Sequence, residues 1–126
     1  MKILVAYYTK TGNTKKVAEA IYEALDKNDK TLKPMKEIED VQGYDLIFCG
    51  FPVHAHSVPV AAQSFLKKIQ PEAKVALFST HGSQREGQMP KEAINNAVGL
   101  VKAEVLGSFT CRGGVEQEII DELMNR

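Results

Sequence analysis

The chain has 126 residues, of which 44% are hydrophobic and 25% charged, a composition typical of one soluble globular domain over residues 1–126. Its 16 basic and 16 acidic side chains cancel, so no overall field favours nucleic acid or an anionic membrane. No apolar run approaches the roughly 20 residues of a membrane span, and the N-terminus lacks a signal-peptide cleavage site, so we expect a cytoplasmic protein.

Strand patterns and helix patterns alternate along the chain. Apolar, β-branched and aromatic runs predict strands at 3–8, 31–35, 45–50, 74–79 and 104–110. Between them, apolar side chains at three- and four-residue spacing predict a helix at 13–27, a second before Pro71, a third opening at Pro90 and a closing helix at 115–125. The stretch 36–43 has room for one helical turn only. Pro34 removes a backbone donor from the second strand, which suits a sheet edge.

For two of these helices the sequence also predicts details, namely the N-terminus of the second and the buried side of the third. In the second, Ser57 is expected to cap the N-terminus and Pro59 to lie in the first turn. In the third, the expected buried side consists of Ala93, Ile94, Ala97, Val98 and Val101.

The alternation implies a three-layer α/β sandwich, in which helices cover both faces of a parallel sheet. Right-handed crossovers and five strands favour the strand order 2-1-3-4-5. In that arrangement ligands bind at the carboxyl edge of the sheet, where the strand order switches between strands 1 and 3. The loops that meet there are 9–14, 51–57, 80–88 and, farther out, 111–114.

The turn between the first strand and the first helix has an unusual composition. Unpaired backbone N–H groups and the helix dipole attract an anion here, and the hydroxyls of Thr9, Thr11 and Thr14 can each donate a further hydrogen bond. Gly12 allows a sharp bend close to a ligand, and Asn13 tolerates unusual φ values. GxxxxGK[ST] and GxGxxG motifs are absent, so a single terminal phosphomonoester fits better than a diphosphate. Plain helix capping is the alternative.

This turn, Thr9-Lys10-Thr11-Gly12-Asn13-Thr14, resembles the FMN-phosphate loop of the flavodoxin family. The resemblance extends over the whole chain in length and element order. Because the fifth strand has no long insertion, the chain is similar to the short-chain type. The resemblance implies a flavodoxin-like sandwich, bound FMN and redox chemistry, with these six residues around the FMN phosphate.

In flavodoxins two further loops flank the isoalloxazine ring, often with a stacked Trp or Tyr. The matching segments 52–57 and 80–87 contain no Trp, Tyr or Phe, which departs from the family pattern. The resemblance implies that His54 or His56 covers one face of the ring, and that backbone N–H groups of 80–83 meet its pyrimidine edge. The ring-binding residues expected on this basis are Pro52, Val53, His54, His56, Thr80, His81, Gly82 and Ser83.

The three histidines also permit a metal site. His54 and His56 point the same way in an extended segment, and His81 would be a third ligand for zinc or iron. No carboxylate or thiolate lies close in sequence to complete such a site, so no metal is expected. Of the two cysteines, Cys49 is expected to be an inert core thiol, and Cys111 to be structural rather than reactive.

The resemblance implies an FMN electron carrier between redox partner proteins, as a monomer or weak homodimer. The segment 52–57 lacks the Gly or Asn that a peptide flip at the flavin favours, and Lys10, Lys15 and Lys16 lie beside the site. We therefore expect a flavin less specialised for one-electron transfer than in typical flavodoxins. Two alternatives remain: an FMN-dependent reductase of a quinone or similar acceptor, with a loop histidine as proton donor, and a flavin-free binding module.

Overall fold

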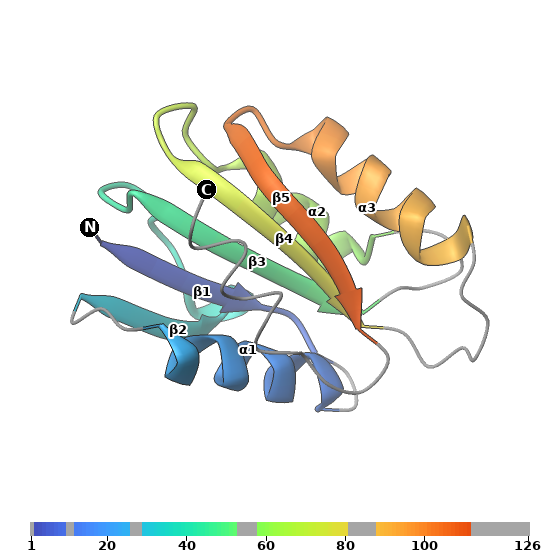
Figure 1. The fold of residues 1–126 in the computed structure, drawn as a ribbon. Coiled ribbons are helices and arrows are strands. Elements are labelled where there is room, and N and C mark those ends of the chain that lie inside the picture. Colours follow the sequence, from blue (N-terminus) through green and yellow to red (C-terminus); the bar gives the residue numbers. More distant parts are fainter. Residues whose placement is uncertain (1, 10–11, 26–28, 53–57, 81–87, 112–126) are drawn as a thin grey trace.

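The structure is a computed structural model that describes residues 2–9, 12–25, 29–52, 58–80 and 88–111, with the side chains of 88–93 and 109–111 left undescribed. The elements are β1 (Ile3–Tyr7), α1 (Asn13–Ala24), β2 (Lys30–Pro34), the 3-10 helix η1 (Met35–Glu37), β3 (Leu46–Pro52), α2 (Val60–Lys67), β4 (Lys74–Thr80), α3 (Gln88–Leu100) and β5 (Glu104–Cys111) (Figure 1). The predicted closing helix at 115–125 lies outside the described residues. No helix within the described ranges is long and apolar enough to cross a membrane.

The five strands form one parallel sheet in the order β2-β1-β3-β4-β5. Helix α1 packs on one face of the sheet, and α2 and α3 pack on the other (Figure 1). The predicted three-layer sandwich and strand order are therefore confirmed. β2 forms one edge of the sheet, as predicted from Pro34.

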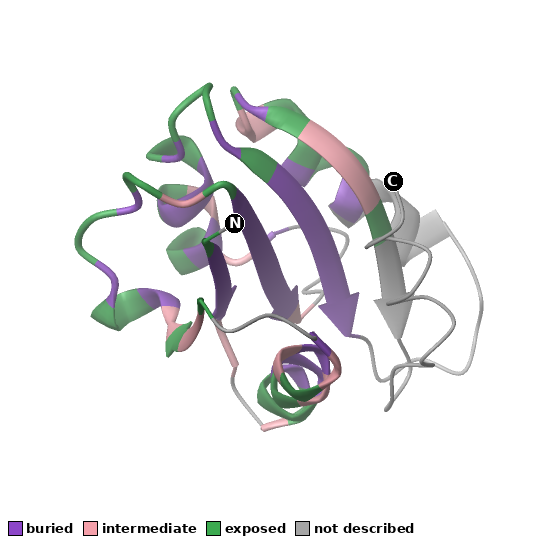
Figure 2. Cartoon of the chain, turned by 60° about the vertical axis from the view of Figure 1, so that its left-hand side comes forward, coloured by how far each residue is buried: buried purple, intermediate pink, exposed green. Residues whose placement is uncertain are grey.

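The sheet divides the core into two layers, because successive side chains of a strand point to opposite faces. In β1, Ile3 and Val5 pack beneath α1, whereas Leu4 and Ala6 pack against the layer of α2 and α3. All four are fully buried, and the central strands appear as continuous buried ribbons in Figure 2. Burial on both faces explains why these strands are apolar throughout rather than alternating.

Helix α1 ends at Ala24, three residues earlier than the periodicity predicts. Leu25 leaves the helical conformation with ψ 116°, and its side chain is buried against the sheet. The ammonium group of Lys30, on β2, then donates hydrogen bonds to the carbonyl oxygens of Tyr22 (2.8 Å) and Leu25 (3.2 Å). A cation at this position satisfies carbonyls left open at the helix end and complements the helix dipole.

Two details of the other helices differ from the predictions. Pro59 is the N-cap of α2, with ψ 146°, rather than a residue of its first turn, because the chain becomes helical only at Val60. In α3, Ile94 and Ala97 are buried as predicted, but Val98 is 40% exposed. Val98 follows Ala97 directly, and the rotation of about 100° per helical residue carries it off the buried stripe.

The thiol of Cys49 lies in β3 and is fully buried, as predicted. Desolvation by this burial raises the pKa of Cys49 well above its ordinary value. The thiolate is the reactive form of cysteine, so the folded protein keeps Cys49 in its unreactive form.

Cys49 gives the protein a pH-dependent stability with a defined sign. The thiol ionises near pH 9 in the unfolded chain but stays protonated in the folded chain. Its contribution is therefore fully present below pH 8 and is lost as the pH rises through 9, by up to about 1.4 kcal/mol per pH unit. We expect urea unfolding between pH 8 and 10 to show a steeper loss of stability for the wild type than for Cys49→Ala. Parallel pH profiles of the two proteins would contradict this.

Candidate functional site

The carboxyl ends of β1, β3 and β4 lie side by side at one edge of the sheet (Figure 1). Pro52 pairs with Thr80 at the ends of β3 and β4. Beyond β1, the N–H of Tyr8 donates to the carbonyl oxygen of Gly50 (2.9 Å), so the chain stays against β3 as it enters the predicted phosphate turn. The sheet therefore brings together the starting points of all three predicted binding segments.

The predicted site residues divide into two groups. Those outside the described residues are Lys10, Thr11, Val53, His54, His56, His81, Gly82 and Ser83. Those within them are Thr9, Gly12, Asn13, Thr14, Pro52 and Thr80, and all six lie at the carboxyl edge of the sheet or at the start of α1. The described part of the chain holds no group of three or more His, Cys, Asp or Glu placed to bind a metal ion. The three histidines of the alternative metal site lie outside the described residues.

Gly12 opens α1 in a left-handed conformation, with φ 94° and ψ −8°. Its carbonyl accepts the first helical hydrogen bond, from the N–H of Lys16 (3.1 Å). Its own N–H donates to Oγ1 of Thr9 (3.0 Å), so Thr9 braces the turn as an acceptor and still has a hydroxyl proton to donate. The backbone here demands a residue without a Cβ, because other residues rarely adopt this φ value.

The first turn of α1 is suited to an anion rather than to self-capping. The N-cap residue is Gly12, which has no side chain to cap the first N–H groups. No acidic residue lies in this turn, and Lys15 within it is exposed. An anion at this turn would be attracted by the open N–H groups, by the positive end of the helix dipole and by the ammonium group of Lys15. The turn therefore fits a phosphate.

Thr14 and Thr80 form a hydrogen bond that links the start of α1 to the end of β4. Their Oγ1 atoms are 2.7 Å apart, and the two residues are only 1% and 4% exposed. The expected role of the Thr80 backbone N–H toward the ring stays a prediction, while its side chain lies on the α1 face and hydrogen-bonds to Thr14. The two-residue period of β4 could have indicated this face, since Ala76 and Phe78 also pack beneath α1.

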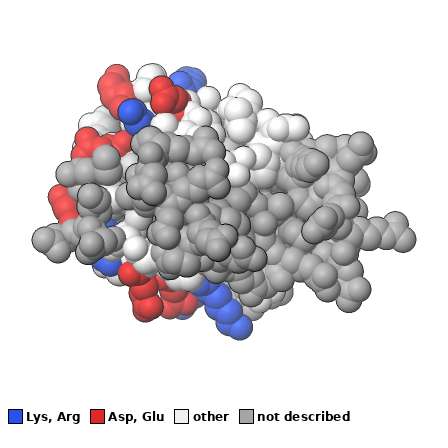
Figure 3. Space-filling view, viewed as in Figure 1, with Lys and Arg blue, Asp and Glu red and all other residues white. Residues whose placement is uncertain are grey.

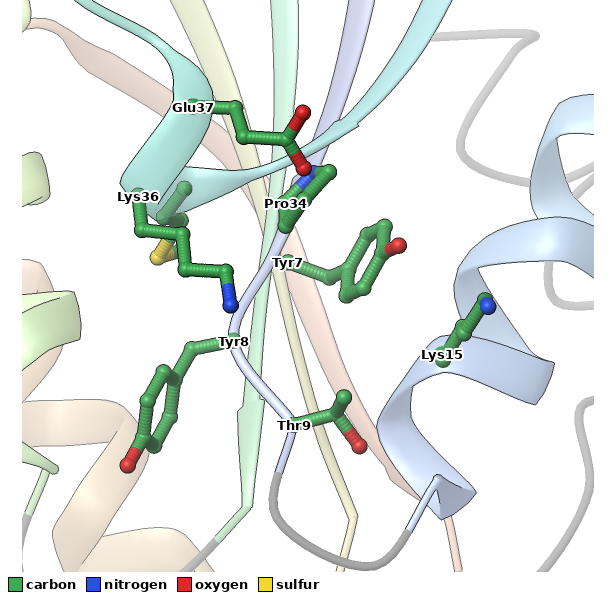
Figure 4. A pocket seen from close by; sticks show the side chains of 8 residues that line it. Tyr7, Tyr8, Thr9, Lys15, Pro34, Lys36 and Glu37 are labelled. Atoms are coloured by element: carbon green, nitrogen blue, oxygen red, sulfur yellow. The ribbon is translucent and has the colours of Figure 1, made fainter.

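A pocket of about 310 Å³ opens beside the phosphate turn (Figure 4). Its lining comes from the end of β1, the turn from β2 into η1, and α1, and consists of Tyr7, Tyr8, Thr9, Lys15, Pro34, Met35, Lys36 and Glu37. Figure 4 shows the Tyr7 side chain directed toward α1 and the Tyr8 side chain directed to the other side of β1. The tyrosine pair directly before the turn was the available signal for this pocket, which the sequence analysis missed.

Comparison with known proteins agrees with this architecture. The chain matches the family described as Flavodoxin domain over residues 4–126. It is 32% identical over 123 residues to the flavodoxin-like domain-containing protein BilS of Clostridioides difficile, a match that covers 93% of this chain and 69% of BilS.

Two solved structures show the same fold. The solution structure of two-electron reduced Megasphaera elsdenii flavodoxin superposes with a TM-score of 0.77 at 20% identity, covering 98% of this chain and 99% of that one. A flavoprotein of Lactobacillus acidophilus in complex with FMN gives a TM-score of 0.72 at 20% identity, covering 98% of each chain. The strand order agrees with the family model and with the similarity to BilS, and the chain belongs to the flavodoxin family.

Proposed function

We propose that this flavodoxin-family protein binds FMN through the turn 9–14 and carries electrons between redox partner proteins, in the cytoplasm, as a monomer or weak homodimer. The observation that supports it best is the left-handed Gly12 N-cap, which leaves the first N–H groups of α1 uncapped beside the Thr9 hydroxyl. A phosphomonoester matches this combination of donors and positive potential. The similar L. acidophilus flavoprotein was solved in complex with FMN.

The protein's own residues bind and orient the cofactor in this proposal. FMN, when bound, supplies reversible electron transfer. Thr9 would donate its hydroxyl proton to the phosphate, and the first-turn N–H groups beginning at Asn13 would donate to the same anion. Pro52 and Thr80 end the strands that lead into 53–57 and 81–87, the segments proposed as walls for the ring. The ring-binding roles of the residues in those segments stay predictions, as do the roles of Lys10 and Thr11.

Charge near the turn supports a reduced flavin with a negative charge. Lys15, Lys16 and Lys36 are exposed close to the turn, and positive charge stabilises an anionic reduced ring by a few kcal/mol at most. The chain as a whole has no net charge, and on the described part of the face in Figure 3 acidic and basic side chains are interleaved. We therefore propose that redox partners meet a locally basic rim on a protein without net charge.

The experiment that tests the proposal compares FMN with riboflavin, which lacks the phosphate. We expect calorimetric titration of the apoprotein to show FMN binding on the order of 100-fold more tightly than riboflavin, because the charge-assisted hydrogen bonds to the phosphate are lost with riboflavin. Absence of heat on adding FMN would exclude the proposed function. Equal affinities would exclude the phosphate-binding turn.

The pocket supports a second candidate, an FMN-dependent reductase of a quinone or similar acceptor. The two tyrosines and Pro34 give it apolar walls. Lys15 and Lys36 outweigh the single carboxylate of Glu37, so the lining has a net positive charge and can hold a planar acceptor with an anionic group. Stopped-flow oxidation of the reduced protein by a sulfonated quinone distinguishes the two candidates. Saturation of the rate with quinone concentration supports a reductase, whereas a strictly linear dependence supports the carrier.

A further inference from the structure

The hydrogen bond between Thr14 and Thr80 has a property that neither residue has alone. Each hydroxyl has one proton to donate, so in the pair one residue donates and the other accepts. If Thr14 gives its proton to a phosphate, its oxygen has only lone pairs left for Thr80, and Thr80 must then be the donor. A phosphate that accepts the Thr14 proton therefore fixes the direction of the hydrogen bond, with Thr80 as donor and Thr14 as acceptor.

We propose that Thr80 is a positioning residue for the phosphate site and acts through Thr14. By donating to Thr14, it holds that side chain in place and leaves the Thr14 proton free for the anion. The inference rests on the proposed FMN function. It adds to the phosphate site a side-chain role for Thr80, which lies 66 positions after Thr14 in the sequence. Both residues are buried, and hydrogen bonds that are linked in a chain polarise one another more strongly where the dielectric constant is low. Burial therefore strengthens the influence of Thr80 on the Thr14 hydroxyl.

The position of Thr80 supports this role rather than a direct one. Its side chain shares the α1 face of β4 with Ala76 and Phe78, and its hydroxyl is within hydrogen-bond distance of Thr14. Thr14 in turn lies in the first helical turn, directly after Gly12 and Asn13. A phosphate bound at the turn would therefore lie beside Thr14, which is hydrogen-bonded to Thr80.

The test uses Thr80→Val, which keeps the side-chain shape and removes the hydroxyl. We expect about a tenfold loss of affinity for FMN and no change for riboflavin, because only the phosphate contact depends on the pair. Thr80→Ser, which restores the hydroxyl, is expected to bind FMN within about threefold of the wild type. Thr31→Val, a half-buried Thr→Val change on the edge strand β2, is the matched control and should leave both affinities unchanged.

A double-mutant cycle with Thr14→Val checks that Thr80 acts through Thr14. In the Thr14→Val background, adding Thr80→Val should cause no further loss of FMN affinity. The double variant also leaves no unpaired hydroxyl in the buried pair, so it remains informative if Thr80→Val alone folds poorly. An equal loss in both backgrounds would overturn the proposal.

The possible failures are distinguishable. A wild type that does not prefer FMN over riboflavin overturns the proposed function and this inference with it. A wild type that does prefer FMN, with the same preference in Thr80→Val, overturns the inference alone. A Thr80→Val protein that loses stability in urea but keeps the wild-type ratio of the two affinities would show a purely structural role and would also overturn it.

Discussion

Replacing Gly50 with alanine is expected to destabilise the protein by about 3 kcal/mol, at the upper end of the usual cost of overpacking a core. Gly50 in β3 lies directly opposite Phe78 in β4, and a Cβ at Gly50 would overlap the aromatic ring of Phe78. The ring is fully buried and cannot move aside without displacing its neighbours in the close-packed layer beneath α1. Urea unfolding monitored by circular dichroism measures the loss.

Gly99→Ala is the matched control for this change. Gly99 lies in α3, is exposed, and a Cβ there would meet nothing within 4 Å. We expect that variant to be more stable by about 0.5 kcal/mol, since alanine favours the helix more than glycine does. Adding Phe78→Leu to Gly50→Ala should cost less than the sum of the two single changes, because the smaller side chain frees space for the new methyl group. A Gly50→Ala protein as stable as the wild type would show that the ring does not fill this space.

Replacing Gly12 with alanine is expected to lower FMN affinity by at least tenfold and to cost about 1 kcal/mol of stability. Gly12 has φ 94°, which a residue with a Cβ adopts only with strain. Alanine would shift the turn away from this conformation. That shift moves the N–H of residue 12, which donates to Thr9, and it moves the start of α1. The Thr9 hydroxyl and the first N–H groups of α1 then no longer point to one phosphate. Calorimetric titration with FMN and urea unfolding measure the two effects.

Gly43→Ala separates backbone strain from the loss of a binding site. Gly43 has φ 86° and open space around its Cβ position, as Gly12 does, but it lies in the turn before β3 and away from the carboxyl edge. We expect a similar loss of stability and an unchanged FMN affinity. If both variants lost FMN affinity to the same extent, the loss would reflect general destabilisation and the assigned role of Gly12 would be wrong.

The parts of the fold that could be predicted are those set by local sequence and by general rules of chain connection. Continuous apolar runs identify strands buried on both faces, and Pro34 identifies an edge. The helix ends could not be predicted as well, because they depend on contacts from elsewhere in the chain. α1 stops at Ala24 where Leu25 turns into the core and Lys30 of the next strand takes over the open carbonyls.

In the candidate site, too, features set by local sequence could be predicted, whereas features set by distant contacts could not. Thr9 and Gly12 are three residues apart and hydrogen-bond to each other, so their roles in the turn could be read from the local pattern. Thr14 meets a partner on β4, and only the folded sheet brings the two together. The pocket was missed for a similar reason, since Lys36 comes beside Tyr7 only through the crossover from α1 to β2.

The edge strand β2 has a consequence for how this protein behaves when concentrated. An open strand edge presents unpaired backbone groups to which a second chain can add, and this is a common route to fibrils. In β2, Pro34 has no N–H to offer an incoming strand, and the charge of Lys33 is exposed next to it. An added strand would have to accommodate that charge and would leave a gap in the hydrogen-bond ladder at Pro34, so both residues oppose the addition of a second chain at this edge of the sheet.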